Sequence, residues 1–261
     1  VYAKNNCGVM CRFDKAFMKE YICVVRNQMI HSFTLRENII LNKRLYQIYE
    51  VSSNLFINKG YARTQIKDIA DGIGMSVGTM YHYFVGKADI LSFILKVTIE
   101  PEFMEQDFAL PIQPVLFSSL GNEIKATFAA REDAFAQPYR QNDMAYTYEQ
   151  MLSDAFDTIW RYGRGFLLIE KNPDDMKEIA IDYKNYRQKF FGQMLQYVIR
   201  FQENGVCRAL EQPELSTRLM VETIAWWGMH IMNDAFSPQT NVSKETAKSV
   251  CMDALINAFK I

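Results

Sequence analysis

The chain has 261 residues with a net charge of -1, and 49% of them are hydrophobic, which is enough for a sizeable folded core. Glycine and proline are few, with 12 and 7 residues, and this favours long helices over a sheet with many turns. No apolar run reaches the roughly 20 residues that cross a bilayer, and no signal peptide is visible. We therefore expect a cytoplasmic protein without a membrane partner.

The cysteines argue against a protein stabilised by disulfide bonds. The five cysteines are an odd number at scattered positions, which favours free thiols over a disulfide framework. Cys7 and Cys11 are spaced closely enough to bind a metal, but no second pair stands nearby. The sequence therefore predicts neither a metal nor a cofactor.

The charges are distributed unevenly along the chain. Residues 1–87 contain 12 Lys and Arg against 6 Asp and Glu, whereas the remainder contains 17 against 24. A basic segment beside an acidic body is typical of a polyanion-binding module attached to a body that does not bind the polyanion.

Residues 1–34 show neither a clean hydrophobic period nor helix caps. Two explanations stay open: the stretch lies upstream of a native start at Met29, or it is a flexible or partly helical arm. From Leu35 onward apolar residues recur at helical spacing, and Gly60 is a helix stop. We therefore assign 1–34 to an N-terminal extension and 35–88 to the first folded domain.

Within this domain, residues 64–87 have the pattern of a helix-turn-helix. Thr64 is placed as the N-cap of the first helix, and Ala70 is small enough for two helices to cross closely. Gly74 tolerates the positive φ of a tight turn, and Ser76 is placed to cap the second helix. The expected buried anchors are Ile69, Ile73, Met75, Met80 and Tyr83.

The stretch from about Leu45 to Leu91 resembles the DNA-binding domain of the TetR family of regulators. The residues that carry the resemblance are Leu55-Phe56, Gly60-Tyr61, Thr64, Ile66, Asp68-Ile69-Ala70, Gly74-Met75-Ser76, Gly78-Thr79-Met80-Tyr81, Tyr83-Phe84 and Lys87. They stand in the family's order without gaps. Val77 departs from the pattern, because many members have a polar or basic residue there; this bears on base preference and not on the fold.

The resemblance implies a partner and a set of contacts. The partner is a double-stranded DNA operator with an inverted repeat, bound by a homodimer whose recognition helices lie about one helical turn apart. The implied DNA-binding residues are Thr64, Ser76, Val77, Gly78, Thr79, Tyr81, His82, Tyr83 and Lys87. Thr64 and Lys87 would bond phosphates. Thr79, Tyr81 and His82 would face the groove, with Tyr81 and Tyr83 mostly on the DNA backbone.

Three of these residues have a simpler explanation. Tyr83 can be a core residue together with Phe84, and His82 can be a solvated surface histidine. Lys87 can be an ordinary lysine at a helix start. The helix dipole disfavours a cation at that end, however, and this favours an anionic partner for Lys87.

After Pro101 the chain is predicted to form further helices, because no segment alternates as a strand does. We therefore predict an all-α fold in which residues 89–261 form a helical effector-binding and dimerisation domain. The candidate residues of an effector pocket are Phe156, Trp160, Tyr183, Arg187, Phe190 and Met194. The alternative is an ordinary helical core, and Arg187 suits either an anionic ligand or a surface salt bridge.

The end of the chain resembles the dimerisation region of the same family, in which two helices per subunit form a four-helix bundle across a two-fold axis. The candidate interface residues are Leu219, Trp227, Ile231, Leu255 and Phe259. Trp226 and Trp227 are adjacent and cannot face the same way, so we expect one inside the subunit and the other at the interface.

These patterns predict a transcription regulator and not an enzyme. His31, His82 and His230 lie in separate segments, and neither a phosphate-binding glycine loop nor a serine nucleophile elbow occurs. The family's usual mechanism is a repressor released from its operator when a small-molecule effector tilts the helix from Lys87 to Ile99. Activators also exist in the family. The alternative is a TetR-like protein controlled by a protein partner, which a body without a cavity would favour.

Overall fold

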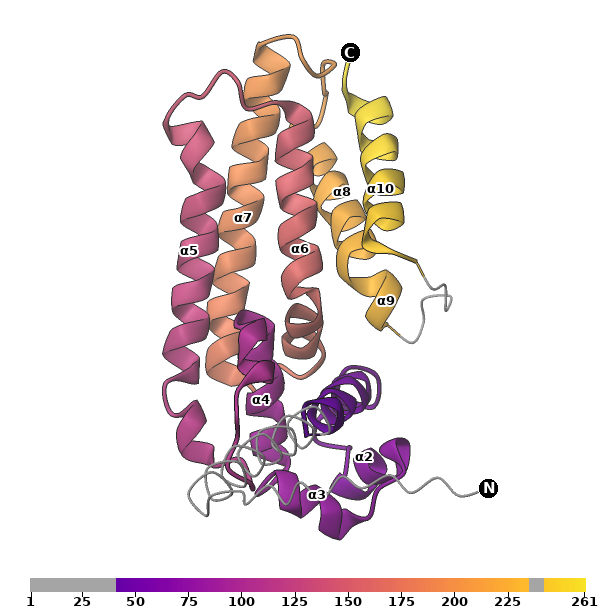
Figure 1. Ribbon diagram of the computed structural model, residues 1–261. Helices are drawn as coiled ribbons and strands as arrows, with labels where there is room; N and C mark the ends of the chain where they lie inside the picture. The colour runs from indigo at the N-terminus through magenta and orange to yellow at the C-terminus, as the bar shows by residue number, and fades with distance from the viewer. Residues whose placement is uncertain (1–40, 235–241) are drawn as a thin grey trace, which may run out of the picture. The chain divides into compact units, whose positions relative to one another are not determined.

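The computed structural model describes residues 41–234 and 242–261 (Figure 1). The predicted extension 1–34, with its Cys7 and Cys11, therefore lies outside the described residues, as does the start of the first predicted helix.

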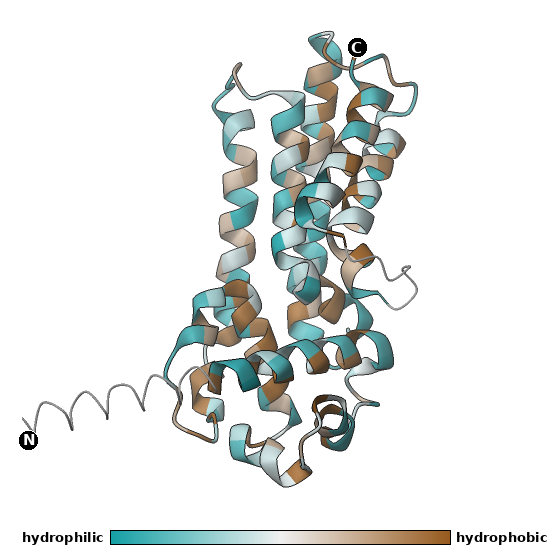
Figure 2. Cartoon of the chain, turned by 45° about the vertical axis from the view of Figure 1, so that its right-hand side comes forward, coloured by the Kyte–Doolittle hydropathy of each residue, from teal (hydrophilic) through white to brown (hydrophobic). Residues whose placement is uncertain are grey.

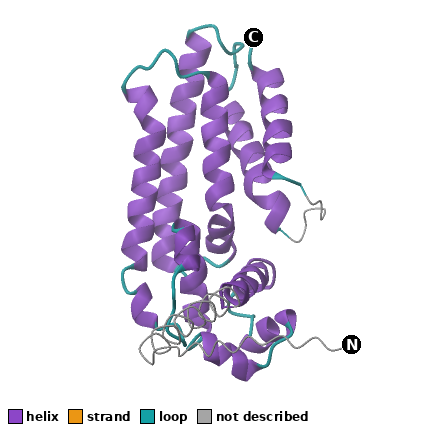
Figure 3. Cartoon of the chain, in the orientation of Figure 1, coloured by secondary structure: helices purple, strands orange, loops and turns teal. Residues whose placement is uncertain are grey.

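The description that follows concerns Leu45–Ile261, which form one compact unit. Within its described residues every regular element is a helix, and two isolated bridges, Phe84 with Ile112 and Cys207 with Lys260, do not extend into strands (Figure 3). The all-α prediction is confirmed. No helix of the described part is both long enough and apolar enough to cross a membrane.

The first helices are short and follow the predicted breaks. The first helix of this unit covers residues 45–55 and continues as a single π turn, η1 (Phe56–Gly60), which ends where Gly60 adopts a φ of 95°. The next helices are α2 (Ile66–Ile73), α3 (Val77–Tyr83) and α4 (Lys87–Ile99). Leu45, Phe56, Ile69 and Met80 form the core between them, each at most 1% exposed. The predicted boundary between residues 88 and 89 falls inside α4.

Three long helices form the body of the unit and stand side by side in Figure 1: α5 (Leu120–Arg140), α6 (Tyr148–Lys171) and α7 (Lys177–Glu203). The shorter elements are η2 (Pro101–Glu105), η3 (Pro114–Phe117), α8 (Pro213–Ala225), η4 (Trp226–His230), α9 (Ile231–Asn233) and α10 (Lys244–Phe259). The long helices carry hydrophilic and hydrophobic residues in alternation along their length, as amphipathic helices do (Figure 2). α7 ends at Glu203, as predicted from Asn204 and Gly205.

Two glycines allow α6 to lie close to its neighbours. A Cβ atom added to Gly163 would lie 2.5 Å from the Cβ of Met229 in η4, and one added to Gly165 would lie 2.7 Å from Thr98 Cγ2 in α4. Beside these contacts, Arg161 Nη1 donates to Thr98 O at 2.6 Å. α6 therefore contacts α4 through Arg161 and Gly165 and η4 through Gly163.

The burial of α10 corrects part of the predicted dimer interface. Leu255 and Phe259 are 3% and 4% exposed within their own chain, and the Tyr148 hydroxyl donates to Leu255 O. Both side chains face the core of the unit, so they are not available to a second subunit. The stripe of α10 that the sequence assigns to dimerisation is instead the one that packs internally.

Candidate functional site

The first helix of the helix-turn-helix begins one residue later than predicted. Its N-cap is Gln65, and Asp68 Oδ2 accepts from Gln65 N–H at 2.8 Å and from Lys59 Nζ at 2.6 Å. These two donors hold the pKa of the Asp68 carboxyl below its ordinary value. Thr64 is 1% exposed, and its hydroxyl donates to Gly60 O at 2.8 Å. Thr64 therefore closes the turn after η1, and its hydroxyl is not available to bond a phosphate.

The turn between α2 and α3 has the predicted construction. Gly74 adopts a φ of 74°, and its N–H bonds back to Ala70 O and Asp71 O to close the end of α2. Ser76 is the N-cap of α3, because its hydroxyl oxygen accepts from Thr79 N–H at 3.0 Å. Both predicted roles, the positive φ of Gly74 and the cap of Ser76, are confirmed.

One face of α3 is exposed and the other packs inside. Met80 and Phe84 are each 1% exposed and hold α3 in the core. The exposed side chains are those of Ser76, Val77, Tyr81 and His82, with the Gly78 backbone exposed beside them. Thr79 and Tyr83 are half-buried, and the Thr79 hydroxyl bonds that of Ser76 at 2.8 Å. The face offers hydroxyls, an imidazole and a valine, which are groups able to bond phosphates and to touch base edges.

Lys87 is occupied within its own chain. Its ammonium donates to Tyr61 O at 2.7 Å and to Thr64 O at 2.9 Å, and it lies 4.3 Å from the centroid of the Tyr61 ring. The carbonyls compensate for the unfavourable position of a cation at the start of α4. An anionic partner is therefore not needed to explain this lysine.

Two cations that the sequence analysis does not select lie near the start of α2. Arg63 and Lys67 are exposed and have no ion pair in the described part of the chain. The N-terminus of a helix favours anions, so cations beside it form a suitable place for a phosphate. The sequence alone could have indicated this pair of cations, because Arg63 directly precedes the predicted N-cap Thr64 and Lys67 follows it by three residues.

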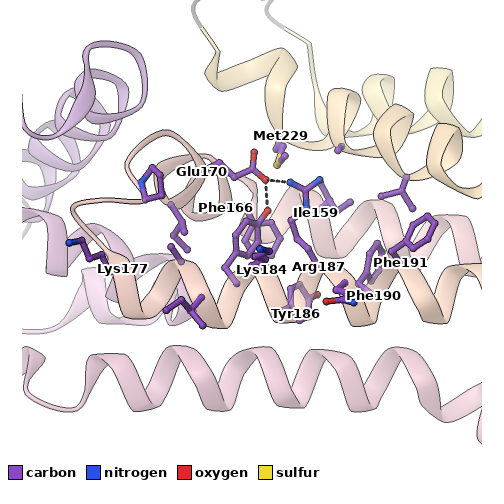
Figure 4. A pocket seen from close by; sticks show the side chains of 18 of the residues that line it. Ile159, Phe166, Glu170, Lys177, Lys184, Tyr186, Arg187, Phe190, Phe191 and Met229 are labelled. Carbon is purple, nitrogen blue, oxygen red and sulfur yellow. Dashed lines mark hydrogen bonds and ion pairs between the residues drawn. The ribbon is translucent and has the colours of Figure 1, made fainter.

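A cavity of about 950 Å3 lies between α6, α7, α8 and η4 (Figure 4). A single stripe of α7 lines it from Lys177 through Lys184 to Phe191, a length of about 21 Å at 1.5 Å per residue. The other walls come from α6, including Phe166, and from η4, including Met229. The volume is at the upper end of the range for drug-sized ligands, about 300–1,000 Å3.

A polar cluster stands inside this mostly apolar cavity. Glu170 Oε1 accepts from the Tyr183 hydroxyl and from Arg187 Nη1, both at 2.7 Å, as the dashed lines in Figure 4 mark. Burial and the nearby Glu170 carboxylate raise the pKa of Tyr183 well above its ordinary value, so Tyr183 remains a neutral donor. Arg187 thus has an internal partner, as the salt-bridge explanation requires, while it also lines the cavity.

The cavity separates the predicted effector residues into two groups. Tyr183, Arg187 and Phe190 line it. Phe156 and Met194 do not, because both are 0% exposed in the core; Trp160 stacks on Phe156 with 5.8 Å between the ring centroids and is not part of the wall either. The lining residues that the sequence analysis misses include Ile159, Phe166, Glu170, Tyr186, Phe191, Arg218, Val221 and Met229.

An apolar stripe is exposed on the C-terminal helices. Leu215, Leu219 and Trp226 are 65%, 58% and 43% exposed, and their spacing places them along one side of α8 and η4. Trp227 and Ile231 are half-buried, so Trp226 is the more exposed of the two tryptophans. Of the predicted interface residues, Leu219 is the most exposed.

The sequence profile of the family described as "Bacterial regulatory proteins, tetR family" matches residues 48–92. Residues 48–92 are therefore similar to the tetR family, and this segment is named the tetR-family domain after that similarity. The match spans η1, α2 and α3, so every predicted DNA contact lies inside the tetR-family domain, whereas the cavity lies wholly outside it.

Curated relatives are similar over a limited length. The HTH-type transcriptional repressor KstR2 of Mycobacterium tuberculosis is 32% identical over 56 residues, which are 22% of this chain and 28% of the relative. The repressor of the same name from Rhodococcus jostii is 30% identical over 60 residues, which are 23% and 29%. The matched segment thus spans less than a third of the length of these tetR-family relatives.

A solved structure, the ketosteroid transcriptional regulator KstR2 of Mycobacterium tuberculosis, is similar with a TM-score of 0.48 and 14% identity. The similarity covers 84% of this chain and 95% of that chain.

Proposed function

We propose that this protein is a transcription regulator of the repressor type, which binds an inverted-repeat operator as a homodimer and is released by a small molecule. The observation that carries the proposal is the exposed face of α3, from Ser76 to His82, on a helix capped by Ser76 and anchored by Met80. A short, anchored helix with an exposed polar face suits insertion into a major groove. The tetR-family match over residues 48–92 supports the same function.

We propose two kinds of contact with DNA. Tyr81 and His82, with Val77 and the Gly78 backbone, would lie against the groove and its edges. Phosphate contacts would come from Arg63 and Lys67, which replace Thr64 and Lys87 in that role. This division assigns base preference to α3 and salt-dependent affinity to the start of α2.

Selection from a random duplex library with the purified chain tests the DNA-binding function. We expect enrichment of an inverted repeat. Tyr81→Ala should weaken its binding at least tenfold. Lys67→Gln should lower the slope of affinity against salt by about 1.8, which is about 0.9 for each of the two subunits on the operator. Lys125→Gln is the matched control, because Lys125 is an exposed lysine on α5. Failure to enrich any sequence, or equal effects of Lys67→Gln and Lys125→Gln, would contradict the proposal.

The cavity supports control by a small molecule over control by a protein partner. We propose an effector that is largely apolar and carries one polar group able to bond the cluster of Glu170, Tyr183 and Arg187. A thermal-shift screen of such compounds tests this. Compounds that raise the melting temperature of the parent should have no effect on Ala180→Trp, whose indole would occupy the cavity. Equal shifts in both proteins would place binding elsewhere.

The exposed stripe of Leu215, Leu219 and Trp226 supports a homodimer. We propose that it packs against its own copy across a two-fold axis, so that two α3 helices are presented to one operator. Exposed apolar residues gathered along one side of a helix are typical of such an interface.

A further inference from the structure

One side chain at the end of α6 bonds to the backbone of the tetR-family domain. Asn172 follows Lys171, the last residue of α6, and is 4% exposed. Its Oδ1 accepts from Tyr61 N–H at 2.6 Å, and its Nδ2 donates to Phe56 O and to Leu168 O, both at 2.9 Å. The amide therefore uses its acceptor and both donor hydrogens to join α6 to the first helix.

The two bonded groups in the first helix mark an irregular turn. Phe56 O and Tyr61 N–H are five residues apart, which is the spacing of the π turn η1. A side chain that bonds into a helical ladder is a known cause of local distortion, and π turns inside α-helices often occur at functional sites. The end of the first helix thus has a shape that depends on a residue of the body.

Tyr61 is also hydrogen-bonded to Lys87, which links it to the rest of the tetR-family domain. Its carbonyl accepts from Lys87 Nζ at 2.7 Å, and the same ammonium bonds Thr64 O at 2.9 Å. Lys87 is the first residue of α4, and Thr64 directly precedes the N-cap of α2. Asn172, Tyr61 and Lys87 therefore form a continuous set of hydrogen bonds from α6 to the starts of α4 and α2.

The other end of this set lies at the cavity. Glu170 and Pro173 both line the cavity, and Asn172 stands between them in the chain. Glu170 belongs to the cluster with Tyr183 and Arg187. A molecule that enters the cavity and displaces the backbone of α6 at Glu170 would move Asn172, two residues further along the chain, with it.

We propose that Asn172 is the positioning residue through which occupation of the cavity acts on the DNA-binding helices. The inference rests on the proposed function in one respect, that the cavity is the effector site. An occupant displaces the end of α6; Asn172 then shifts Tyr61 and Phe56, and Lys87 carries the shift to α2 and α3. This route connects α6 directly to α2 and α3, in addition to the tilt of α4 expected from the sequence.

The test fills the cavity without a ligand. Ala180→Trp places an indole in it, and four proteins are compared: the parent, Ala180→Trp, Asn172→Ala and the double variant. The first readout is amide hydrogen exchange of peptides within residues 62–75, none of whose atoms bonds Asn172. The second is affinity for the selected operator. Filling the cavity should raise exchange several-fold and lower affinity by about tenfold, within the usual range of coupling between sites. In the Asn172→Ala background both effects should fall to less than twofold.

Two further variants distinguish a specific role of Asn172 in coupling the cavity to the DNA-binding helices from a general loss of protein stability. Asn204→Ala, at the C-cap of α7, is the matched control and should leave both effects of Ala180→Trp intact. Asn172→Asp keeps the acceptor for Tyr61 N–H but loses both donors, so it should transmit an intermediate effect. If circular dichroism shows that Asn172→Ala is unfolded, Asn172→Asp carries the comparison.

The possible outcomes distinguish a failure of the inference about Asn172 from a failure of the proposed function. Equal effects of Ala180→Trp with and without Asn172, or no change in exchange when the cavity of the parent is filled, would overturn the inference. A change in exchange that depends on Asn172, with no change in operator affinity, would support the link and contradict effector-controlled DNA binding.

Discussion

The sequence allows two roles for Lys87, a phosphate contact or a structural lysine at a helix start, and the structure supports the second. The family resemblance implies a phosphate contact, and the cation at a helix start supports it. In the structure the ammonium bonds Tyr61 O and Thr64 O and covers the Tyr61 ring. Its charge therefore interacts with the partial negative charge of two carbonyl oxygens in the turn between η1 and α2.

Lys87→Met should consequently destabilise the protein instead of changing its electrostatic attraction to DNA. We expect the free energy of unfolding in urea to fall by about 1.5–3 kcal/mol, the range for hydrogen bonds to charged groups. The slope of DNA affinity against salt should not change. Arg63→Gln is the counterpart, with unchanged stability and a slope lower by about 1.8, because each of the two subunits loses one phosphate contact. A lower slope for Lys87→Met at full stability would restore its predicted phosphate contact.

Gly163 is a residue whose role depends on the closeness of two helices. Gly163→Ala should reduce the free energy of unfolding by about 1–3 kcal/mol, because the new Cβ would overlap Met229. Gly192→Ala in α7 is the control, because nothing lies within 4 Å of its added Cβ. That variant should gain about 0.5–1 kcal/mol from helix propensity. Equal urea midpoints for the two variants would refute close packing of α6 on η4.

At the scale of elements, we expect the N-cap of α3 to support both the stability of the helix and the proposed DNA binding. Ser76→Ala should cost about 1 kcal/mol of unfolding free energy, because Thr79 N–H loses its acceptor. It should also weaken operator binding, because the first turn of α3 carries Val77 and Gly78.

Ser243→Ala in α10 is a close match for this variant. Ser243 also caps its helix by accepting from the N–H three residues on, at 3.2 Å. It should cost a similar free energy and leave operator affinity unchanged. If both serine variants weakened binding equally, reduced stability alone would explain the effect and α3 would have no special role.

The sequence correctly predicts turns and helix caps that depend only on residues close together in the chain. Gly74 and Ser76 act on their own turn, so their types and spacing were sufficient. Thr64 shows the limit of this approach, because the choice between Thr64 and Gln65 as N-cap depends on which backbone Asp68 bonds.

The cavity was predicted only in part, because its walls come from segments far apart in the chain. The helical period correctly places Tyr183 and Phe190 on a shared side of α7, but Phe156 faces the core and not the cavity. A period shows which residues share a face and cannot show which neighbour that face meets. Asn172 was invisible for the same reason, since its partners Phe56 and Tyr61 are more than a hundred residues away.

At the scale of the whole molecule, the two proposed sites act together only if two copies associate. In the proposed function one α3 helix contacts one half-site, and affinity for an inverted repeat requires two such helices at a fixed separation. α6 contacts both the tetR-family domain and η4, so the body that holds the cavity also supports the exposed stripe on α8. A shift of α6 would therefore alter the orientation of each α3 relative to the dimer axis.

Leu219→Glu should separate the dimer, because a carboxylate would be buried without a partner at the centre of the apolar stripe. We expect the parent to be a dimer and the variant a monomer by light scattering at micromolar concentration. The variant should keep the helical content of the parent, because Leu219 is 58% exposed in the single subunit. Operator affinity should fall at least a hundredfold, since only one half-site contact remains for each chain. Val115→Glu, at a valine that is 71% exposed on η3, should change neither mass nor affinity. A parent that is monomeric, or a Leu219→Glu variant that remains dimeric, would assign the interface to another surface.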